Sequence, residues 1–209
     1  MYARISRVKA PTERIDDLVS EFTGKALPAL KEIDGYAGHS FGVNRESGDC
    51  QAVTFWEGED ALEASGEAAT RIRTATTQAA GASIASVETY ETLMMERAQR
   101  PRTPAYVRVT RGQAEPGRID ELARRMRENA LPAVRDLPGF MALVLNANRE
   151  SGKFAITSVW SGAEEREASL EAIKDIRRET FEAIGAGDAE PSNYEVVSVE
   201  FVGAAAATS

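Results

Sequence analysis

The chain repeats itself once along its 209 residues. The pentapeptide Asn-Arg-Glu-Ser-Gly occurs at residues 44–48 and again, letter for letter, at residues 148–152. Matched positions before and after it keep the same offset of 104, without an insertion or a deletion. They include Tyr2/Tyr106, Ile15/Ile119, Pro28/Pro132, Trp56/Trp160 and Tyr90/Tyr194. One register over so many positions indicates a tandem duplication, so both copies are expected to fold alike.

Each copy opens with a strand pattern followed by a helical one. Residues 2–9 alternate loosely between apolar and polar side chains, as a strand does. Apolar residues then recur at helical spacing over residues 12–30, with counterparts over residues 119–134. Pro28 and Pro132 lie inside these patterns, where proline lacks an N–H group and clashes with the preceding turn. We therefore expect a break or kink just before each proline.

The repeated pentapeptide is expected to be a turn between two strands. It ends in Gly48 or Gly152, and glycine readily adopts the positive φ that a tight hairpin requires. A turn explains these residues better than a binding site does. A second helix over about residues 60–78 and a last strand over about residues 87–96 complete the ferredoxin-like order β-α-β-β-α-β.

The predicted organisation is a pair of such repeats, and the fold class is α+β. The first repeat spans residues 1–96, residues 97–104 link it to the second, and the second spans residues 105–202. The small residues at positions 203–209 form a tail that we expect to be disordered.

Side-chain alternation in the hairpin predicts how the sheets are covered. If Asn44 faces Gly48, one face of the first hairpin carries Tyr36, Gly38, Ser40, Thr54 and Trp56, and the other carries His39, Phe41, Val43, Val53 and Phe55. Both faces are largely apolar, which a sheet with one face in water would not show. Helices cover only one face of a ferredoxin-like sheet, so the sheet of the other repeat is the expected second cover. The repeats would thus form an intramolecular pseudo-dimeric α+β barrel.

Charge and composition exclude several classes of function. The formal net charge of −8 disfavours binding to the phosphates of nucleic acid. No apolar run approaches the ~20 residues that a membrane span needs, and the N-terminus lacks a signal-peptide core, so we expect a cytoplasmic protein without membrane contact. With one cysteine, Cys50, and one histidine, His39, the chain has no internal disulfide and no zinc site of the Cys/His type. We expect neither a metal nor another cofactor.

The hairpin and the segment after it resemble the antibiotic-biosynthesis-monooxygenase family. The resemblance is carried by residues 44–62 and 148–164, in which Trp56 and Trp160 end a strand before an acidic helix start. It extends over nearly all of both repeats. It implies a dimeric α+β barrel, here formed within one chain, with a pocket between sheet and helices. Members of that family include cofactor-independent oxygenases that convert aromatic polyketides into quinones, and haem-degrading enzymes.

Two features of those members are absent from this chain. Quinone-forming members have an asparagine four residues before the tryptophan, whereas Ala52 and Ile156 lie there in this sequence. Haem-degrading members use a histidine on the following helix, and neither copy has one there. Only Trp56 and Trp160 carry over from the resemblance, so the catalytic residues are unassigned and enzymatic activity stays an open question.

A difference between the copies predicts where a ligand would bind. On one predicted sheet face the first copy carries Gly38 and Ala52 where the second carries Ala142 and Ile156. The second helix of the first copy also carries smaller side chains than its counterpart. Close-packed cores do not leave such a loss of volume unfilled. We therefore predict a pocket in the first repeat and a filled core in the second. The predicted substrate-binding residues are Phe22, Tyr36, Gly38, Ser40, Thr54, Trp56 and Ile72.

Two classes of function are compatible with this pocket. The first is a cofactor-independent monooxygenase-like protein that acts on or binds a small planar apolar molecule. Trp56 and Tyr36 would position that molecule, and Ser40, Thr54 or His39 would supply polar contacts. The second is a non-catalytic small-molecule-binding or structural protein of the same fold.

In the second class the conspicuous side chains serve packing. Trp56 and Trp160 would close the end of each sheet against a helix, and His39 and Cys50 would be buried core residues. In either class we expect a monomeric pseudo-dimer, and further pairing into homodimers stays open.

Overall fold

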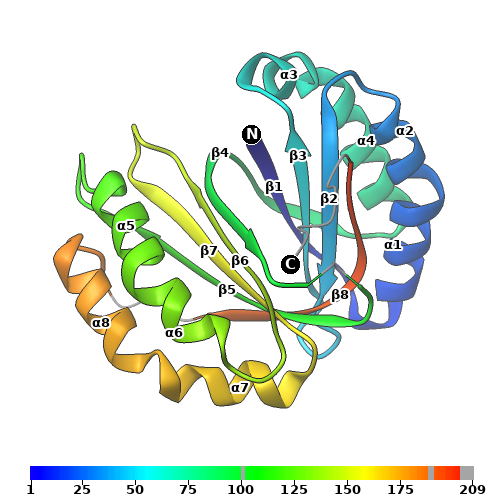
Figure 1. Ribbon diagram of the computed structural model, residues 1–209. Helices are drawn as coiled ribbons and strands as arrows, with labels where there is room; N and C mark the ends of the chain where they lie inside the picture. Colours follow the sequence, from blue (N-terminus) through cyan, green and yellow to red (C-terminus); the bar gives the residue numbers. More distant parts are fainter. Residues whose placement is uncertain (100–101, 188–190, 203–209) are drawn as a thin grey trace. The chain divides into compact units, whose positions relative to one another are not determined.

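The same succession of strands and helices occurs twice along the chain (Figure 1). The computed structural model describes residues 1–99, 102–187 and 191–202. The first copy comprises β1 (Tyr2–Lys9), α1 (Ile15–Glu21), α2 (Leu27–Lys31), β2 (Tyr36–Val43), β3 (Asp49–Trp56), α3 (Glu59–Ala64), α4 (Gly66–Ala79) and β4 (Ser83–Arg97). The second comprises β5 (Ala105–Gln113), α5 (Ile119–Arg125), α6 (Leu131–Arg135), β6 (Phe140–Ala147), β7 (Lys153–Trp160), α7 (Ala163–Ala172), α8 (Lys174–Ala183) and β8 (Ser192–Phe201).

The strands are antiparallel and follow the order β1-β3-β2-β8-β5-β7-β6-β4, which closes into a barrel. The predicted α+β fold, with two ferredoxin-like repeats in a pseudo-dimeric α+β barrel, is confirmed. Two compact units can be distinguished along the chain. One consists of Met1–Thr89 with the segment that begins at Tyr194, and the other is Tyr90–Asn193.

Each compact unit completes its sheet with the last strand of the other copy. In the first unit β2 pairs with β8, and His39 lies opposite Glu200. In the second unit β6 pairs with β4 from Glu91 onward. The boundaries of the compact units therefore fall within or beside β4 and β8, which are the strands that end each copy.

A π-helical turn precedes the proline in the first helix of each copy. Phe22–Ala26 connects α1 to α2, and Met126–Ala130 connects α5 to α6. The Leu27 N–H group donates to the carbonyl oxygen of Phe22, five residues earlier, so the helix is widened directly before Pro28. A π turn accommodates the backbone that a proline leaves without a regular hydrogen bond. The expected interruption before each proline is confirmed.

The second helix of the first copy is divided at Ser65, between α3 and α4. The prediction of one continuous helix over residues 60–78 is wrong at this point. The Ser65 hydroxyl donates to the Leu62 carbonyl oxygen at 2.6 Å and accepts a hydrogen bond from the buried Arg4 at 2.8 Å. A serine that bonds its own helix backbone competes with regular helical bonding, and here a long-range partner holds it in that conformation.

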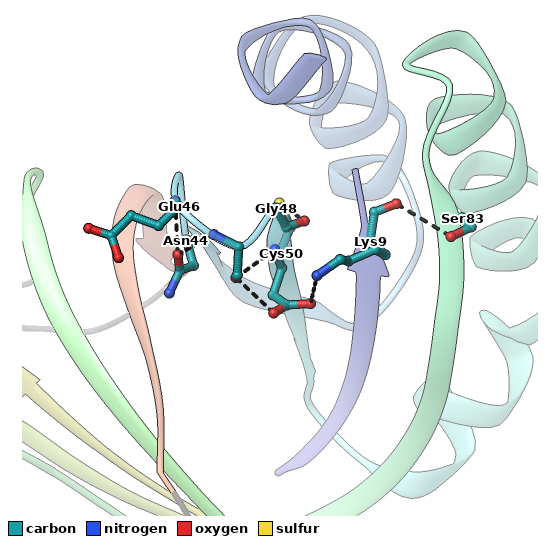
Figure 2. A network of polar contacts seen from close by, with 8 residues as sticks. Lys9, Asn44, Glu46, Gly48, Cys50 and Ser83 are labelled. Carbon is teal, nitrogen blue, oxygen red and sulfur yellow. Dashed lines mark hydrogen bonds and ion pairs between the residues drawn. The ribbon is translucent and has the colours of Figure 1, made fainter. Parts of the chain in front are cut away.

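The repeated pentapeptide forms the hairpin turn, as predicted. Asn44 Oδ1 accepts hydrogen bonds from the N–H groups of Glu46 at 3.0 Å and Ser47 at 2.9 Å. Figure 2 shows this turn beside the ion pair of Lys9 with the first residue of β3. Gly48 has φ +79°, and a Cβ at this position would collide with a backbone carbonyl oxygen, so no other residue fits without strain.

The arginine of the pentapeptide joins the turn to two other elements. Arg45 Nη1 donates to Asp16 Oδ1 of α1 at 2.9 Å, and its Nε lies 3.7 Å from Glu195 Oε2 of β8. In the second unit Arg149 makes the equivalent contacts to α5 and β4. Each exposed pair contributes only about 0–1 kcal/mol. Their repetition accounts for the recurrence of the arginine in the turn.

A β-bulge in the second strand overturns part of the predicted face assignment. Tyr36 lies opposite Trp56 as predicted, but the register shifts between Tyr36 and Gly38, so that His39 and not Gly38 lies opposite Thr54. Gly38 has φ +147°, which an L side chain rarely adopts. A one-residue shift moves every later side chain to the opposite face of the sheet.

The bulge turns large residues of β2 toward the helices. Phe41 and Val43 belong to the same core as the helical residues of the first unit. Gly38 and Ser40 consequently lie on the face away from the helices. The corresponding shift occurs in the second unit after Phe140.

The strands of the first unit are buried on both faces. Helices α1, α2 and α4 lie along one face, where Val8, Phe41 and Cys50 are core residues (Figure 1). On the opposite face Ile5 and Phe55 are only 3% and 4% exposed. The prediction that neither face meets water is confirmed for these residues.

Two further predictions concern the C-terminal tail and membrane-spanning helices. The tail at positions 203–209, for which the sequence predicts disorder, lies outside the described residues. Within the described part of the chain, no helix is long and apolar enough to cross a membrane.

Replacing Gly48 with alanine should lower the free energy of unfolding by about 1–3 kcal/mol, because the backbone must keep a strained positive φ or move away from the carbonyl of Ala10. Gly24→Ala is the control, because a Cβ there meets nothing within 4 Å and a helical alanine is favoured over glycine. Urea unfolding followed by tryptophan fluorescence measures both. Equal midpoints for the two variants would contradict the role assigned to the turn.

Candidate functional site

Each compact unit has a cavity between its sheet and its helices. The two cavities have the same volume, about 60 Å³ each. This is several times the ~10–15 Å³ that one water molecule requires. The prediction that only the first repeat would be hollow is therefore wrong.

The cavities are equal because changes in side-chain size compensate. Ala52, Ala69 and Thr77 in the first cavity are smaller than their counterparts in the second. Phe22 and Leu30 are larger than theirs. The bulge adds to this compensation, since it turns the small residues of β2 away from the cavity.

The structure brings only some of the predicted site residues together. Phe22, Thr54 and Ile72 line the first cavity. The other four predicted residues, Tyr36, Gly38, Ser40 and Trp56, do not line it.

A buried arginine forms one wall of the first cavity. Arg4 on β1 is 7% exposed, and its Nη atoms donate to Ser65 Oγ at 2.8 Å and to the Leu62 carbonyl at 2.6 Å. Its guanidinium lies 5.6 Å from the centre of the Trp56 ring, within the range of a cation–π contact. Burial, and then the charge of Arg73, lower the pKa of Arg4. The group is nevertheless a cation at neutral pH.

A second arginine lines the same cavity from α4. Arg73 Nη2 donates to Thr70 Oγ1 at 3.0 Å, and its Nε is buried without a hydrogen-bond partner. Burial lowers the pKa of Arg73 as well. In the part of the chain that the structure describes, no carboxylate pairs with Arg4 or Arg73. Two uncompensated cations thus line an otherwise largely apolar space.

The second cavity has the same pair of cations. Arg108 and Arg177 lie 104 positions after Arg4 and Arg73, and both line it. None of these four arginines is among the site residues predicted from the sequence. The signal that could have found them is the retention of arginine at both places in both copies, while the apolar lining changed.

His39 lies beside the first cavity without lining it. Its Nδ1 is 2.7 Å from the Tyr36 hydroxyl and its Nε2 is 2.7 Å from Ser198 Oγ. Burial lowers the pKa of His39 to about 4, so the ring is neutral at pH 7. In the second unit Phe140 matches Tyr36 and Leu143 matches His39, and both are apolar. Both ring nitrogens of His39 are engaged, which agrees with a satisfied core histidine.

The tryptophans are packing residues in this structure. Trp56 is fully buried, its indole N–H donates to Thr54 Oγ1 at 3.2 Å, and its ring meets the edge of Tyr36 at 6.1 Å. Trp160 donates to Ser158 Oγ at 3.0 Å in the same way. Neither tryptophan lines the first or the second cavity.

Cys50 is not an activated nucleophile. The thiol is buried and lies 3.7 Å from the Gly48 carbonyl oxygen (Figure 2). Burial raises the pKa of Cys50 to about 11, so the thiolate is not populated at neutral pH. Among the described residues, moreover, no group of three or more His, Cys, Asp or Glu side chains is arranged to hold a metal ion.

Two uncharacterized proteins of Mycobacterium tuberculosis (strain H37Rv), Rv2557 and Rv2558, are similar to this chain over both repeats. They are 28% and 27% identical to it over 196 and 198 residues. The alignments cover 94% of this chain and 87% and 83% of the two relatives. No protein-family model matches the sequence.

Solved structures of the same fold come from monooxygenase-like proteins. An anthrone oxidase-like protein superposes with a TM-score of 0.70 at 17% identity, over 97% of this chain and 94% of its own. A monooxygenase-like protein of Listeria innocua gives 0.53 at 12% identity, over 93% of each chain. A Listeria monocytogenes ferredoxin-fold protein related to antibiotic biosynthesis monooxygenases gives 0.52 at 12% identity, over 94% and 95%. The predicted similarity to that family is confirmed at the level of the fold.

The pKa of His39 predicts a pH dependence of stability. Its folded value of about 4 lies below the ordinary 6.5, so the unfolded chain binds more protons between these values. Stability is fully present above about pH 6.5 and is lost as the pH falls toward 4, by at most about 3 kcal/mol. His39→Leu, the residue at the matched position 143, should abolish this part of the slope.

Proton NMR can follow this single histidine directly. We expect a titration midpoint near 4 and, in urea unfolding between pH 4 and 7.5, a shallower slope for His39→Leu than for the unmodified protein. A midpoint near 6.5 would contradict the buried, neutral state.

Proposed function

We propose that this protein is monooxygenase-like and binds a small, planar, largely apolar molecule in the first cavity. The observation that carries the proposal is a largely apolar cavity lined by the guanidinium groups of Arg4 and Arg73, neither of which pairs with a carboxylate among the described residues. The fold shared with monooxygenase-like proteins supports the choice of reaction class. Fold alone does not carry an activity, so the cavity must account for the chemistry.

The walls of the cavity suit a flat apolar ring. Phe22 and Phe41 stack with their centroids 4.4 Å apart, and Leu18 and Ile72 add aliphatic surface. Such a lining favours an apolar molecule through burial, at roughly 25 cal/mol for each Å² removed from water. The hydroxyl of Thr54 is a polar contact on the sheet side. The ligand is thus an apolar body with few polar groups.

The guanidinium groups suggest which apolar molecules would react. A phenol or enol bound near two cations ionises more easily, because the cations stabilise the anion. An enolate or phenolate is electron-rich enough to react with dioxygen without a metal or flavin. In this proposal Arg4 and Arg73 stabilise the charge that the substrate develops, and the apolar walls keep water away from it.

The second candidate is a binding protein without catalysis. A specific observation favours it, because none of the described residues that line the first cavity is a carboxylate or a histidine. A general base must lie within hydrogen-bond reach of the proton that it removes, and the nearby His39 is already engaged at both nitrogens. Only a substrate acidic enough to ionise beside the two arginines would then react.

Oxygen uptake with anthrone and with 1-naphthol as probes tests the proposal. We expect both compounds to bind, and at least one of them to raise oxygen consumption above the rate without protein. Ala52→Ile places in the first cavity the residue that the second cavity has at Ile156, and should lower binding and uptake about tenfold. Ala75→Ile, the same substitution at an exposed position of α4, should change neither.

The outcomes separate the candidates. Binding that Ala52→Ile abolishes, without any uptake, would establish the non-catalytic candidate. If neither probe binds, or if uptake is the same in Ala52→Ile as in Ala75→Ile, the first cavity is not the site and the proposal fails.

A further inference from the structure

The second cavity has a buried cation with an unused hydrogen-bond donor. Arg108 is 3% exposed, and its Nη atoms donate to Ser169 Oγ at 2.8 Å and to the Arg166 carbonyl oxygen. Its Nε is buried and has no hydrogen-bond partner. An unsatisfied buried donor destabilises the folded state, and more so on a charged group, so such a donor calls for an occupant.

The charges around Arg108 compensate its positive charge only in part. Arg177 lines the same cavity, and its guanidinium lies 6.0 Å from the centre of the Phe181 ring. The nearest carboxylate, Glu167, is 3.8 Å from Arg108, beyond hydrogen-bond distance, and its side chain is 61% exposed. Burial lowers the pKa of Arg108 to about 10; Glu167 raises it, while Arg166 and Arg177 lower it further. The cavity is therefore positively charged within a chain whose net charge is −8.

The remaining walls of the second cavity are largely apolar and carry larger side chains than those of the first at three places. Ile156, Ile173 and Phe181 stand where the first cavity has two alanines and a threonine. Leu143 and Met126 complete an aliphatic lining. A ligand that fits must combine a small apolar body with one negatively charged group.

We propose that the cavity of the second unit binds the carboxylate of a small apolar acid. One carboxylate oxygen accepts the free Nε–H of Arg108, and the other accepts a donor of Arg177. Charge-assisted bonds between guanidinium and carboxylate are about twice as strong as neutral ones, and they satisfy the buried cation.

This site is independent of the function proposed for the first cavity. It uses other residues, requires no oxygen chemistry and binds its ligand as an anion from the outset. If the first cavity proves inactive, the proposed anion site in the second cavity still stands. If the second cavity binds no anion, the function proposed for the first cavity still stands.

The two tryptophans allow the second cavity to be observed alone. Trp56→Phe leaves Trp160 as the single tryptophan, and the Trp160 indole bonds Ser158, which lines the second cavity. Benzoate is the probe, and benzamide is its neutral counterpart of the same shape. In the Trp56→Phe protein we expect benzoate to change the Trp160 fluorescence saturably and to shift the Arg108 Nε–H resonance in NMR. Benzamide should bind at least about tenfold more weakly.

Matched variants in the same background locate the site. Arg177→Met keeps the length of the side chain and should weaken benzoate binding about tenfold. Arg178→Met is the control, because Arg178 is exposed and pairs with Asp175 outside the cavity. Arg73→Met removes a cation from the first cavity and should leave the Trp160 signal unchanged.

Three results would overturn the proposal. They are equal binding of benzoate and benzamide, equal binding by Arg177→Met and Arg178→Met, and the absence of any change in the Trp160 and Arg108 signals at millimolar benzoate. The Nε–H resonance reports on Arg108 without replacing it, so the test does not depend on a variant that loses the bonds to Ser169 and Arg166.

Discussion

The hydrogen bonds of a buried arginine hold together the part of the structure on which the candidate site depends. Arg4 extends from β1 beneath the helices, where Ser65 and the Leu62 carbonyl receive its donors and Trp56 faces its guanidinium. The contact with Ser65 coincides with the break between α3 and α4, and so helps to set where α4 crosses the sheet. Burying a guanidinium costs several kcal/mol, which hydrogen bonds offset only when the geometry is good. The same contacts therefore place one wall of the cavity and give that wall its charge.

Duplication has kept the charged framework and altered the apolar lining around it. Arg108 repeats the role of Arg4, with Ser169 in place of Ser65. Around this framework some lining side chains are larger in the first cavity and others are larger in the second, so the two cavities keep the same volume. Buried cations are costly unless charges or hydrogen bonds compensate them; a carboxylate, Glu167, lies 3.8 Å from Arg108, whereas no carboxylate among the described residues pairs with Arg4.

The copies also differ in the polarity of the core beside the cavity. The first unit places His39 between the hydroxyls of Tyr36 and Ser198. The second unit has Leu143 in place of His39 and Phe140 in place of Tyr36. Ser198 belongs to β8, which comes from the other copy, so this network exists only because the last strands are exchanged. Satisfied buried networks rigidify a core and define one packing arrangement. The polar network is therefore a structural difference between the two sites and not an active centre in itself.

The sequence by itself determined the duplication, the order of elements, the glycine-ended turn at Gly48 and the interruption before Pro28, because each depends on neighbours within a few residues. Only the tertiary structure decided which residues face the cavities. The bulge at Gly38 reverses which faces the later side chains of β2 occupy. At the bulge β2 pairs with β8, which lies far away in the sequence, so no local pattern predicts it. The cationic pair of Arg4 and Arg73 likewise arises from segments that lie far apart in the sequence and meet only when α4 packs on the sheet. Local periodicity predicts elements, whereas register and burial depend on contacts between distant parts of the chain.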